Sequence, residues 1–289
     1  MSATLKQLQV FVAVADESGF AAAADVLGMS QSSVSHTLAT LERHVGAALV
    51  HRAPCAVTDD GARLLPHARA TLAAADAFEA ATPSRAPFSG TITLAITPTA
   101  GHRVAPDLLG RWRTHAPGIR VRLLEGDDLE VATWLETGAA DTAILVNPAP
   151  TYGRLIVAHD EFHAVTRADH PLAGSEPITL ADLLNDPLLV STAGCEPQIK
   201  DLHREAAVTY KPAQRVRELT TLMAMVDADL GVTIMPTLAS PMLPTTLTMT
   251  PLANTMTRNL VLAGPATRPW NPLVRTLHEL VNVPKPSSQ

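Results

Sequence analysis

The segment from Phe20 to Val45 constrains the fold most, because it predicts two helices joined by a tight turn. Residues 21–27 are rich in good helix formers, and Gly28 can end that helix in the left-handed conformation without a Cβ penalty. Ser30 follows as a candidate N-cap of the second helix. An apolar stripe at helical spacing then predicts the side of the second helix that is buried: Val34, Leu38, Leu41 and Val45.

The polar side of this second helix carries small hydrogen-bonding groups near its N-terminal end. The side chains opposite the stripe are Ser32, His36, Thr40 and Arg43, with Gln31 and Ser35 on the flanks. A helix that enters the DNA major groove needs such groups to meet the edges of the bases. A helical bundle with a solvated outer face would show the same pattern, so this segment alone leaves both interpretations open.

Composition describes a globular chain that is long enough for two or three domains. It has 289 residues, of which 46% are hydrophobic and 17% charged. No apolar run reaches the roughly 18 residues that a membrane span needs, and the N-terminus lacks a signal-peptide cleavage site. Cys55 and Cys195 are far apart and form no paired metal-binding pattern. We therefore expect a cytoplasmic protein without a membrane partner, a metal or a cofactor.

The charge balance does not favour DNA binding. The net charge of the chain is −6, and residues 1–64 hold four basic and six acidic side chains, a net charge of −2. Attraction to phosphates is therefore weak, which counts against DNA binding where that attraction dominates the affinity. Helix N-terminal amides also bind phosphates, and several copies of a weak contact add up.

The flanking segments extend the helix-turn-helix pattern. Residues 4–18 predict a helix that buries Leu5, Leu8, Val12 and Ala15 and is broken by Gly19. Residues 49–57 predict a small β-wing around a proline turn. Arg52 lies at the edge of this wing, where it either contacts a phosphate or the minor groove or is simply solvated.

A long helix over residues 59–81 follows, with Thr58 as its cap and two acidic residues in its first turn. Pro66 should kink it or set its first turn. A helix that joins two globular parts must bury its apolar stripe, and a second copy of the chain is the expected cover. The stripe is Leu64, Leu65, Ala68, Leu72, Ala75 and Phe78. The composition of residues 82–87 predicts a hinge.

Beyond the hinge the pattern changes to strands alternating with helices. We expect strands at 91–97, 119–123 and 141–146 with helices at 104–114 and 129–137 between them, which indicates a parallel sheet. A second round begins after a crossing strand at 161–165. It comprises a capping-box helix at 179–182, strands at 188–191, 215–219 and 231–236, and helices at 198–209 and 221–228. A strand at 260–263 returns the chain to the first lobe, and a final helix begins at Pro272 with Asn271 as its cap.

The order of these parts resembles the LysR-type transcriptional regulators over nearly the whole chain. Residues 5–15 resemble the opening helix of that family, and residues 20–42 resemble its helix-turn-helix signature. Thr58 to Gly61 stands where the family has Thr-x-x-Gly. Further landmarks follow at the expected spacing: Glu125-Gly126, residues 135–141, His170-Pro171-Leu172 and residues 230–236.

The resemblance implies an N-terminal all-α winged helix-turn-helix with a long linker helix, and a C-terminal α/β effector domain of two lobes, like a periplasmic binding protein. The expected domains are 1–58 for DNA binding, 59–87 for the linker helix and hinge, and 88–289 for the effector domain. Lobe I comprises 88–161 and 267–289, and lobe II comprises 162–266. The resemblance further implies a non-enzymatic regulator of transcription. Its expected partners are double-stranded promoter DNA, a small-molecule effector, RNA polymerase and other copies of itself, as a linker-helix homodimer and a homotetramer.

The resemblance also assigns site residues. It carries over Gln31, Ser32, Ser35 and His36 as the positions that read bases and phosphates. Ser30, Thr40 and Arg43 of the same helix region and Arg52 of the wing complete the expected DNA-binding set. The effector set is Thr97, Pro98, Thr99, Phe162, His163, Ser191, Thr192, Cys195, Thr220 and Thr221. Parallel sheets bind ligands beyond the carboxyl ends of their strands, and hydroxyls at helix starts suit an anion, so we expect a small carboxylate effector. Each threonine is equally well explained as a simple helix cap.

Four positions depart from the family pattern. Ser32 stands where the family often has Pro, and His36 where it often has Arg, so His36 is expected to meet a base edge without a fixed charge. Val50 replaces a usual Phe before the wing arginine, and Asp229 replaces a usual Gly at a helix end.

Other chemistry remains open at two places. His159 and His163 are spaced for a metal site, although the extended strand expected there favours histidines near the crossing between lobes. Cys195 lies in a cleft loop and is a candidate redox thiol without a nearby second cysteine to resolve it. A solute-binding protein would share the two lobes but lack the DNA-binding head, and an enzyme would need a catalytic constellation that the sequence does not show.

Overall fold

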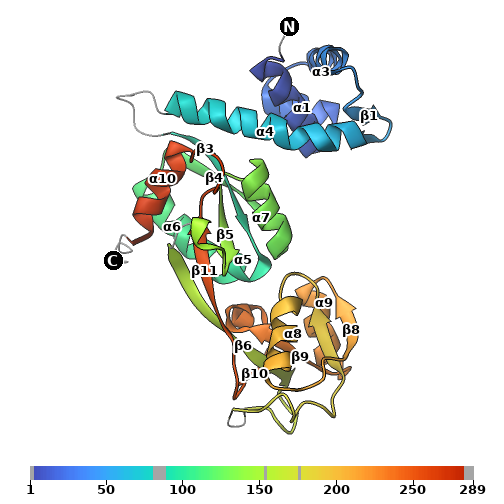
Figure 1. The fold of residues 1–289 in the computed structure, drawn as a ribbon, viewed down its shortest axis with the longest axis vertical. Coiled ribbons are helices and arrows are strands. Elements are labelled where there is room, and N and C mark those ends of the chain that lie inside the picture. Colours follow the sequence, from blue (N-terminus) through green and yellow to red (C-terminus); the bar gives the residue numbers. More distant parts are fainter. Residues whose placement is uncertain (1–2, 81–88, 153–154, 175–176, 283–289) are drawn as a thin grey trace.

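The computed structural model describes residues 3–80, 89–152, 155–174 and 177–282. These residues form a helical head, a long helix and two α/β lobes, stacked along the longest axis of the molecule (Figure 1). The predicted hinge at 82–87 lies outside the described residues. Among those residues, no helix combines the length and the apolar character that a bilayer crossing requires.

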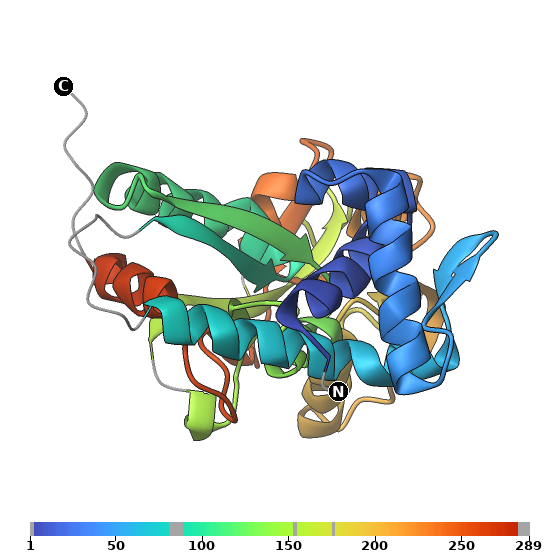
Figure 2. The same cartoon turned by 90° about the horizontal axis from the view of Figure 1, so that it is seen from above.

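The head contains α1 (Leu5–Glu17), α2 (Phe20–Leu27) and α3 (Gln31–Val45), followed by the wing strands β1 (Val50–Arg52) and β2 (Cys55–Val57). Gly28 ends α2 at φ 61°, and the Ser30 hydroxyl accepts a hydrogen bond from the Ser33 amide at 3.2 Å, as the sequence predicted. The two wing strands pair antiparallel, and Figure 2 shows the wing projecting from the head.

The buried face of α1 differs from the predicted one. Val10, Phe11, Ala13 and Val14 are buried, whereas Leu5 is 44% exposed. The prediction followed the leucines, and its Leu8 and Val12 are half-buried against the core, but the fully buried side chains lie on the other side of the helix. Ser18, rather than Gly19, takes the left-handed position at the end of α1.

The linker helix α4 (Asp59–Ala80) begins at a tightly packed corner. Thr58 donates its hydroxyl to the Ala48 carbonyl at 2.6 Å and accepts from the Gly61 amide at 3.0 Å. A Cβ on Gly61 would clash with the Leu49 carbonyl oxygen, so only glycine fits there. Pro66 lies within the helix. Of the predicted apolar stripe only Ala68 is fully buried, and Phe78 is 79% exposed.

Both lobes share one path of strands in the order β4-β3-β5-β11-β6-β9-β7-β8, with β10 paired to β6. In lobe I, β3 pairs parallel with β4 and β5, while β11 is antiparallel. Its apolar core includes the buried Trp112. The elements of lobe I are β3 (Gly90–Ile96), α5 (Pro98–Arg103), α6 (Ala105–His115), β4 (Ile119–Glu125), α7 (Asp128–Thr137), β5 (Thr142–Val146), η1 (Pro150–Tyr152), α10 (Pro272–Glu279) and η3 (Leu280–Asn282).

Lobe II follows the prediction with three differences. Residues 179–182 make the hydrogen bonds of a capping box but form only turns. Strand β8 lies earlier than predicted because α9 already begins at Leu219, and β10 was not predicted. Asp229 takes φ 61°, the left-handed position where the family usually has glycine. The elements are β7 (Leu188–Ser191), α8 (Glu196–Glu205), β8 (Pro212–Val216), α9 (Leu219–Asp227), β9 (Val232–Pro236), η2 (Thr237–Met242) and β10 (Leu247–Pro251).

Two strands connect the lobes: β6 (Ile156–Arg167) and β11 (Thr257–Ala263). Residues of β6 up to Glu161 pair with β11, and those from Phe162 onward pair with β9. The strand therefore changes partners in the middle of its length, which makes this point the hinge between the lobes.

The head also contacts lobe I. The Asp16 carboxylate of α1 accepts a hydrogen bond from Arg69 of α4 and lies 3.8 Å from the guanidinium of Arg122 in β4. Gly138, at the end of α7, has a φ of 81° and packs against the backbone of α4. Head, linker and lobe I thus form one continuous set of contacts.

Candidate nucleic-acid interface and interlobe cleft

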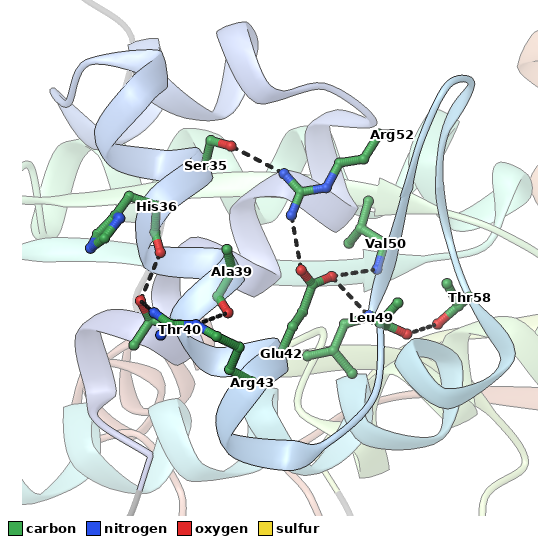
Figure 3. A network of polar contacts seen from close by, with 11 residues as sticks. Ser35, His36, Ala39, Thr40, Glu42, Arg43, Leu49, Val50, Arg52 and Thr58 are labelled. Atoms are coloured by element: carbon green, nitrogen blue, oxygen red, sulfur yellow. Dashed lines mark hydrogen bonds and ion pairs between the residues drawn. The ribbon is translucent and has the colours of Figure 1, made fainter.

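The N-terminal half of α3 presents polar side chains on the outer surface of the head. Gln31, Ser32 and His36 are exposed, while Val34 and Leu38 anchor the helix in the core. In Figure 3 the His36 ring points away from the wing. These three predicted residues are therefore accessible near the start of α3, with Ser32 and His36 opposite the buried stripe and Gln31 on its flank.

Ser30 serves the helix itself. Its hydroxyl caps the Ser33 amide and also lies 2.8 Å from the Ser33 hydroxyl and 3.0 Å from that of Ser32. A hydroxyl with three such neighbours holds the start of α3 in place. The Ser32 hydroxyl is therefore partly oriented by Ser30 before any ligand arrives.

In the C-terminal half of α3, the polar side chains form hydrogen bonds within the helix itself. Thr40 donates its hydroxyl to the His36 carbonyl at 2.9 Å, and Arg43 donates to the Thr40 hydroxyl at 3.0 Å and to the Ala39 carbonyl at 3.4 Å (Figure 3). The two predicted residues Thr40 and Arg43 thus lie along the helix backbone, one turn or more away from Gln31.

Arg52 joins the wing to α3 (Figure 3). It donates to the Ser35 hydroxyl at 3.1 Å and to the Glu42 carboxylate at 2.9 Å, and its guanidinium lies 4.8 Å from the centre of the Phe20 ring. The other Glu42 oxygen accepts from the amides of Leu49 at 2.9 Å and Val50 at 3.3 Å. The sequence indicated that Arg52 is available at the wing edge, but its guanidinium is occupied by groups of the head.

The cleft between the lobes contains a buried ion pair that the sequence did not indicate. Arg258 of β11 and Asp160 of β6 are paired at 2.7 Å, and their side chains are 2% and 0% exposed. Asp160 also accepts from the Thr237 hydroxyl at 2.6 Å and the Leu238 amide at 3.0 Å. Asp160 stands between His159 and Glu161, and Arg258 between Thr257 and Asn259, so the neighbouring residues did not mark either side chain as buried.

Arg258 gathers three of the predicted effector residues. It donates to the Thr99 hydroxyl at 3.2 Å and to the Cys195 sulfur at 3.8 Å, and its guanidinium lies 5.4 Å from the centre of the Phe162 ring. All three side chains are buried. The structure therefore brings Thr99, Phe162 and Cys195 together, but around a buried arginine of the protein itself.

Other predicted effector residues lie at the edge of this cluster or outside it. His163 points to the opposite face of β6, where it contacts Glu161 at 2.9 Å, because neighbouring strand residues alternate between faces. Ser191 donates to the Arg217 carbonyl at 3.1 Å, and the exposed Thr192 lies 3.5 Å from the Val216 carbonyl. The Thr97 hydroxyl is buried and makes no hydrogen bond within the described residues.

The mouth of the cleft is a cavity of about 190 Å³, and Pro98 and Thr220 are among the residues that line it. Thr221 lies beside it at the start of α9, and both threonines are exposed. The charged residues that line this cavity are His102, Glu125, Asp127, Arg217 and Glu218. Arg217 of lobe II binds Glu130 of lobe I at 2.6 Å, so its charge is already paired. The mouth is consequently acidic, which disfavours the predicted carboxylate.

Two titratable groups flank Arg258. Burial raises the pKa of the Cys195 thiol, and Arg258 acts in the opposite direction. Burial likewise raises the pKa of Asp128, against the attraction of Arg258. A Cβ on Gly194, which has φ 106°, would lie 2.8 Å from the Asp128 carboxylate, so the loop before Cys195 approaches lobe I closely.

The two histidines considered for a metal site have partners within the protein. His159 shares a hydrogen bond of 2.8 Å with Asn259, and His163 contacts Glu161. Throughout the described residues, no three side chains of the types His, Cys, Asp and Glu gather as a metal-binding group.

Comparison with known proteins assigns both parts of this architecture. The family model for the bacterial regulatory helix-turn-helix protein of the lysR family matches residues 5–62, and that for the LysR substrate binding domain matches residues 85–282. The chain belongs to the LysR family. LysR proteins are transcriptional regulators and not enzymes, so the head is a DNA-binding domain and the two lobes form the effector-binding domain.

Individual LysR relatives agree with this assignment. A probable hydrogen peroxide-inducible genes activator of Mycobacterium avium is 36% identical over 82% of this chain and 79% of its own length. The structure of the OxyR C206 mutant of Corynebacterium glutamicum is 30% identical, with a TM-score of 0.60 over 97% of this chain and 91% of that one. The LysR regulator CbnR in complex with its target DNA shares the fold, with a TM-score of 0.67 at 22% identity over 96% and 98% of the two chains.

Proposed function

We propose that this LysR regulator reads promoter DNA with the N-terminal half of α3, chiefly through Gln31, Ser32 and His36. The observation that carries the proposal is the division of α3. These three side chains are exposed near the start of α3, whereas Thr40, Arg43 and Arg52 are held by hydrogen bonds within the head. Ser30 and Ser35 support this face, as cap and as partner of Arg52.

The experiment is a gel shift with the upstream region of the protein's own gene, comparing wild type with His36→Ala. We expect about tenfold weaker binding, because one good base contact is worth about 1–3 kcal/mol. The matched control is His44→Ala, which removes another exposed histidine from the last turn of the same helix. Thermal stability should stay unchanged in both variants. Equal promoter affinity of wild type and His36→Ala would contradict the reading role.

We also propose that the protein acts as an oligomer on the promoter. The head lacks the positive charge that usually provides affinity, so several heads must bind together. The exposed Leu64 and Phe78 of α4 support a homodimer through the linker helix, and pairs of dimers give the tetramer. We place its action in the cytoplasm, where it meets RNA polymerase at the promoter.

The domain division that we propose is 1–58, 59–87 and 88–289. The cap at Thr58 and the close packing of Gly61 support a boundary before α4. The change of strand partners between Glu161 and Phe162 supports the division of lobe I from lobe II at that point.

For the effector, we propose a small neutral or cationic molecule that enters the mouth of the cleft beside Pro98 and Thr220. The acidic lining and the volume of about 190 Å³ support this class over the carboxylate expected from the threonines. Pro98 immediately precedes Thr99, which binds Arg258. A ligand at the mouth would therefore alter the contacts of Thr99 and Arg258 and, through them, the angle between the lobes. Titration by calorimetry with small amines and alcohols tests it, and a response equal in wild type and Thr220→Val would contradict it.

A second candidate signal is a peroxide, because the Cys195 sulfur lies 3.8 Å from the Arg258 guanidinium and relatives are named peroxide-inducible activators. The Cys195 thiolate would attack one peroxide oxygen. The O–O bond breaks: the attacked oxygen stays on the sulfur with its hydrogen as a sulfenic acid, and the departing hydroxide takes the proton released by the thiol and leaves as water. Burial raises the pKa of this thiol, which disfavours the reactive thiolate. The other cysteine, Cys55, lies on the wing, far from lobe II (Figure 1).

The peroxide candidate is tested by intact-mass analysis after treatment with hydrogen peroxide. Oxidation at Cys195 predicts a gain of one oxygen in wild type and in Cys55→Ser, but none in Cys195→Ser, together with altered promoter affinity. Oxygen uptake that persists in Cys195→Ser, or leaves promoter affinity unchanged, would dismiss this candidate.

A further inference from the structure

A larger cavity lies at the hinge between the lobes, separate from the mouth of the cleft. Its volume is about 680 Å³, and α5, α6, the first half of β6 and η2 form its walls. Among the described residues, it shares no lining residue with the cleft cavity. We call it the hinge cavity. Its volume is within the range of about 300–1,000 Å³ that small-molecule sites in proteins occupy.

The charge of the hinge cavity is opposite to that of the cleft mouth. Arg103, Arg111 and His159 line it together with one acidic residue, Asp107. Arg111 is half-buried and donates to the Val281 carbonyl at 2.6 Å, which fixes its position, while Arg103 is exposed on the last turn of α5. Guanidinium groups bind carboxylates with two parallel hydrogen bonds.

The remaining walls suit the apolar body of an organic acid. Leu108, Val157 and Leu238 line the cavity beside the hydroxyl groups of Thr237 and Ser240. Metabolite sites combine apolar side chains with convergent polar groups. Three apolar side chains beside two arginines favour an organic carboxylate over inorganic phosphate, which brings no apolar body.

The hinge cavity is also connected to the buried ion pair of the cleft. Thr237 and Leu238, which line it, donate to the same Asp160 carboxylate that binds Arg258. His159 also lines the cavity and is hydrogen-bonded to Asn259. These two residues face each other in β6 and β11, one position along from Asp160 and Arg258. A ligand in the cavity would therefore press on the residues that connect the two lobes.

We propose that the hinge cavity is a second ligand site, which binds a small organic carboxylate through Arg103 and Arg111. This site is independent of the effector proposed for the cleft mouth. It offers a carboxylate the positive charge that the acidic mouth of the cleft lacks. A ligand bound in the hinge cavity would also change the contacts of both lobes.

Calorimetric titration of the full chain with phenylacetate, hexanoate and hexylamine tests the proposal. We expect saturable binding of the two acids and none of the amine. Arg103→Gln should weaken the binding of the acids about tenfold, since it removes a charged hydrogen-bonding partner. Ser240→Trp should abolish it by filling the cavity. The matched control is Arg217→Gln at the cleft mouth, which should bind the acids as wild type does.

Thermal unfolding of each variant establishes that it is folded. The proposal is overturned if wild type binds neither acid, if Arg103→Gln and Ser240→Trp both bind like wild type, or if Arg217→Gln loses binding to the same extent. The promoter gel shift is a separate measurement, so failure of the hinge site and failure of DNA reading are distinguishable.

Discussion

Two arginine–carboxylate pairs join distant segments of this protein, and they differ mainly in burial. Arg52 and Glu42 connect the wing to α3, with side chains 46% and 13% exposed. Arg258 and Asp160 connect β11 to β6 at the hinge, with side chains 2% and 0% exposed. The chemical groups are the same. In each pair the carboxylate also accepts a hydrogen bond from a backbone amide, and the arginine also donates one to a hydroxyl.

The difference shows that the two pairs serve different purposes. An exposed pair is worth about 0–1 kcal/mol, so the pair in the head can orient the wing without determining whether the head folds. A buried pair gains little over apolar residues, but removing one partner leaves an isolated charge at a cost of about 3–5 kcal/mol. Removing one partner of the hinge pair should therefore destabilise the protein far more than removing one partner of the pair in the head.

The largest expected effect is the loss of one partner of the hinge pair. Asp160→Asn leaves the Arg258 guanidinium buried without its charge partner, so the free energy of unfolding should fall by about 3–5 kcal/mol. Urea unfolding followed by circular dichroism measures it. The control is Glu161→Gln, which alters the more exposed carboxylate next along β6. A loss below about 1 kcal/mol in Asp160→Asn would remove the distinction between the two pairs.

A smaller effect tests whether burial alone, without a charge partner, imposes an energetic cost. Burial lowers the pKa of His278 from 6.5 to about 4, beside the Thr142 hydroxyl and the edge of Trp270. The unfolded chain therefore binds a proton at a higher pH than the folded chain does. Stability should be constant above about pH 6.5 and should decline as the pH falls toward 4, by up to about 3 kcal/mol.

The measurement is the free energy of unfolding from urea titrations at several pH values between 7 and 4, for wild type and His278→Gln. The variant should lose the part of the decline that comes from this histidine. The exposed His44 provides the control, because His44→Gln should retain the full decline. Identical pH profiles of wild type and His278→Gln would show that this histidine is protonated equally in both states.

The sequence predicted the parts of the fold that depend on local chemistry. The Gly28 turn, the Ser30 cap, the wing and the Asn271 cap are each determined by a few neighbouring residues, and all are present. The face of α1, the position of β8 and the strand β10 depend on packing against segments far along the chain. Leucine spacing alone therefore missed the most deeply buried side of α1, although Leu8 and Val12 do pack against the core.

The same division explains what could be predicted of the sites. The exposed polar side of α3 follows from helical periodicity, so the exposure of Ser32 and His36 could be predicted, while their contact with DNA stays a prediction. Arg258 and Asp160 are 98 positions apart and meet only because two strands pair across the hinge. The polar neighbours of the two residues, such as Glu161 and Asn259, conceal their burial, and without the register of the strands the sequence does not identify them as partners. The acidic cleft mouth and the basic hinge cavity likewise depend on side chains from several elements.

The smallest effect on stability is expected for the exposed pair, where the readout is DNA binding. Arg52→Ala and Glu42→Gln should each reduce the free energy of unfolding by about 1 kcal/mol or less. If Arg52 acts by holding the wing against α3, both variants should weaken promoter binding by a similar factor, about three- to tenfold, with an unchanged salt dependence. A phosphate contact of Arg52 instead predicts that only Arg52→Ala weakens binding and that its salt slope falls by about one. Gel shifts at several salt concentrations separate the two roles. We expect the first outcome, because both terminal nitrogens of Arg52 are already bound, to Ser35 and to Glu42.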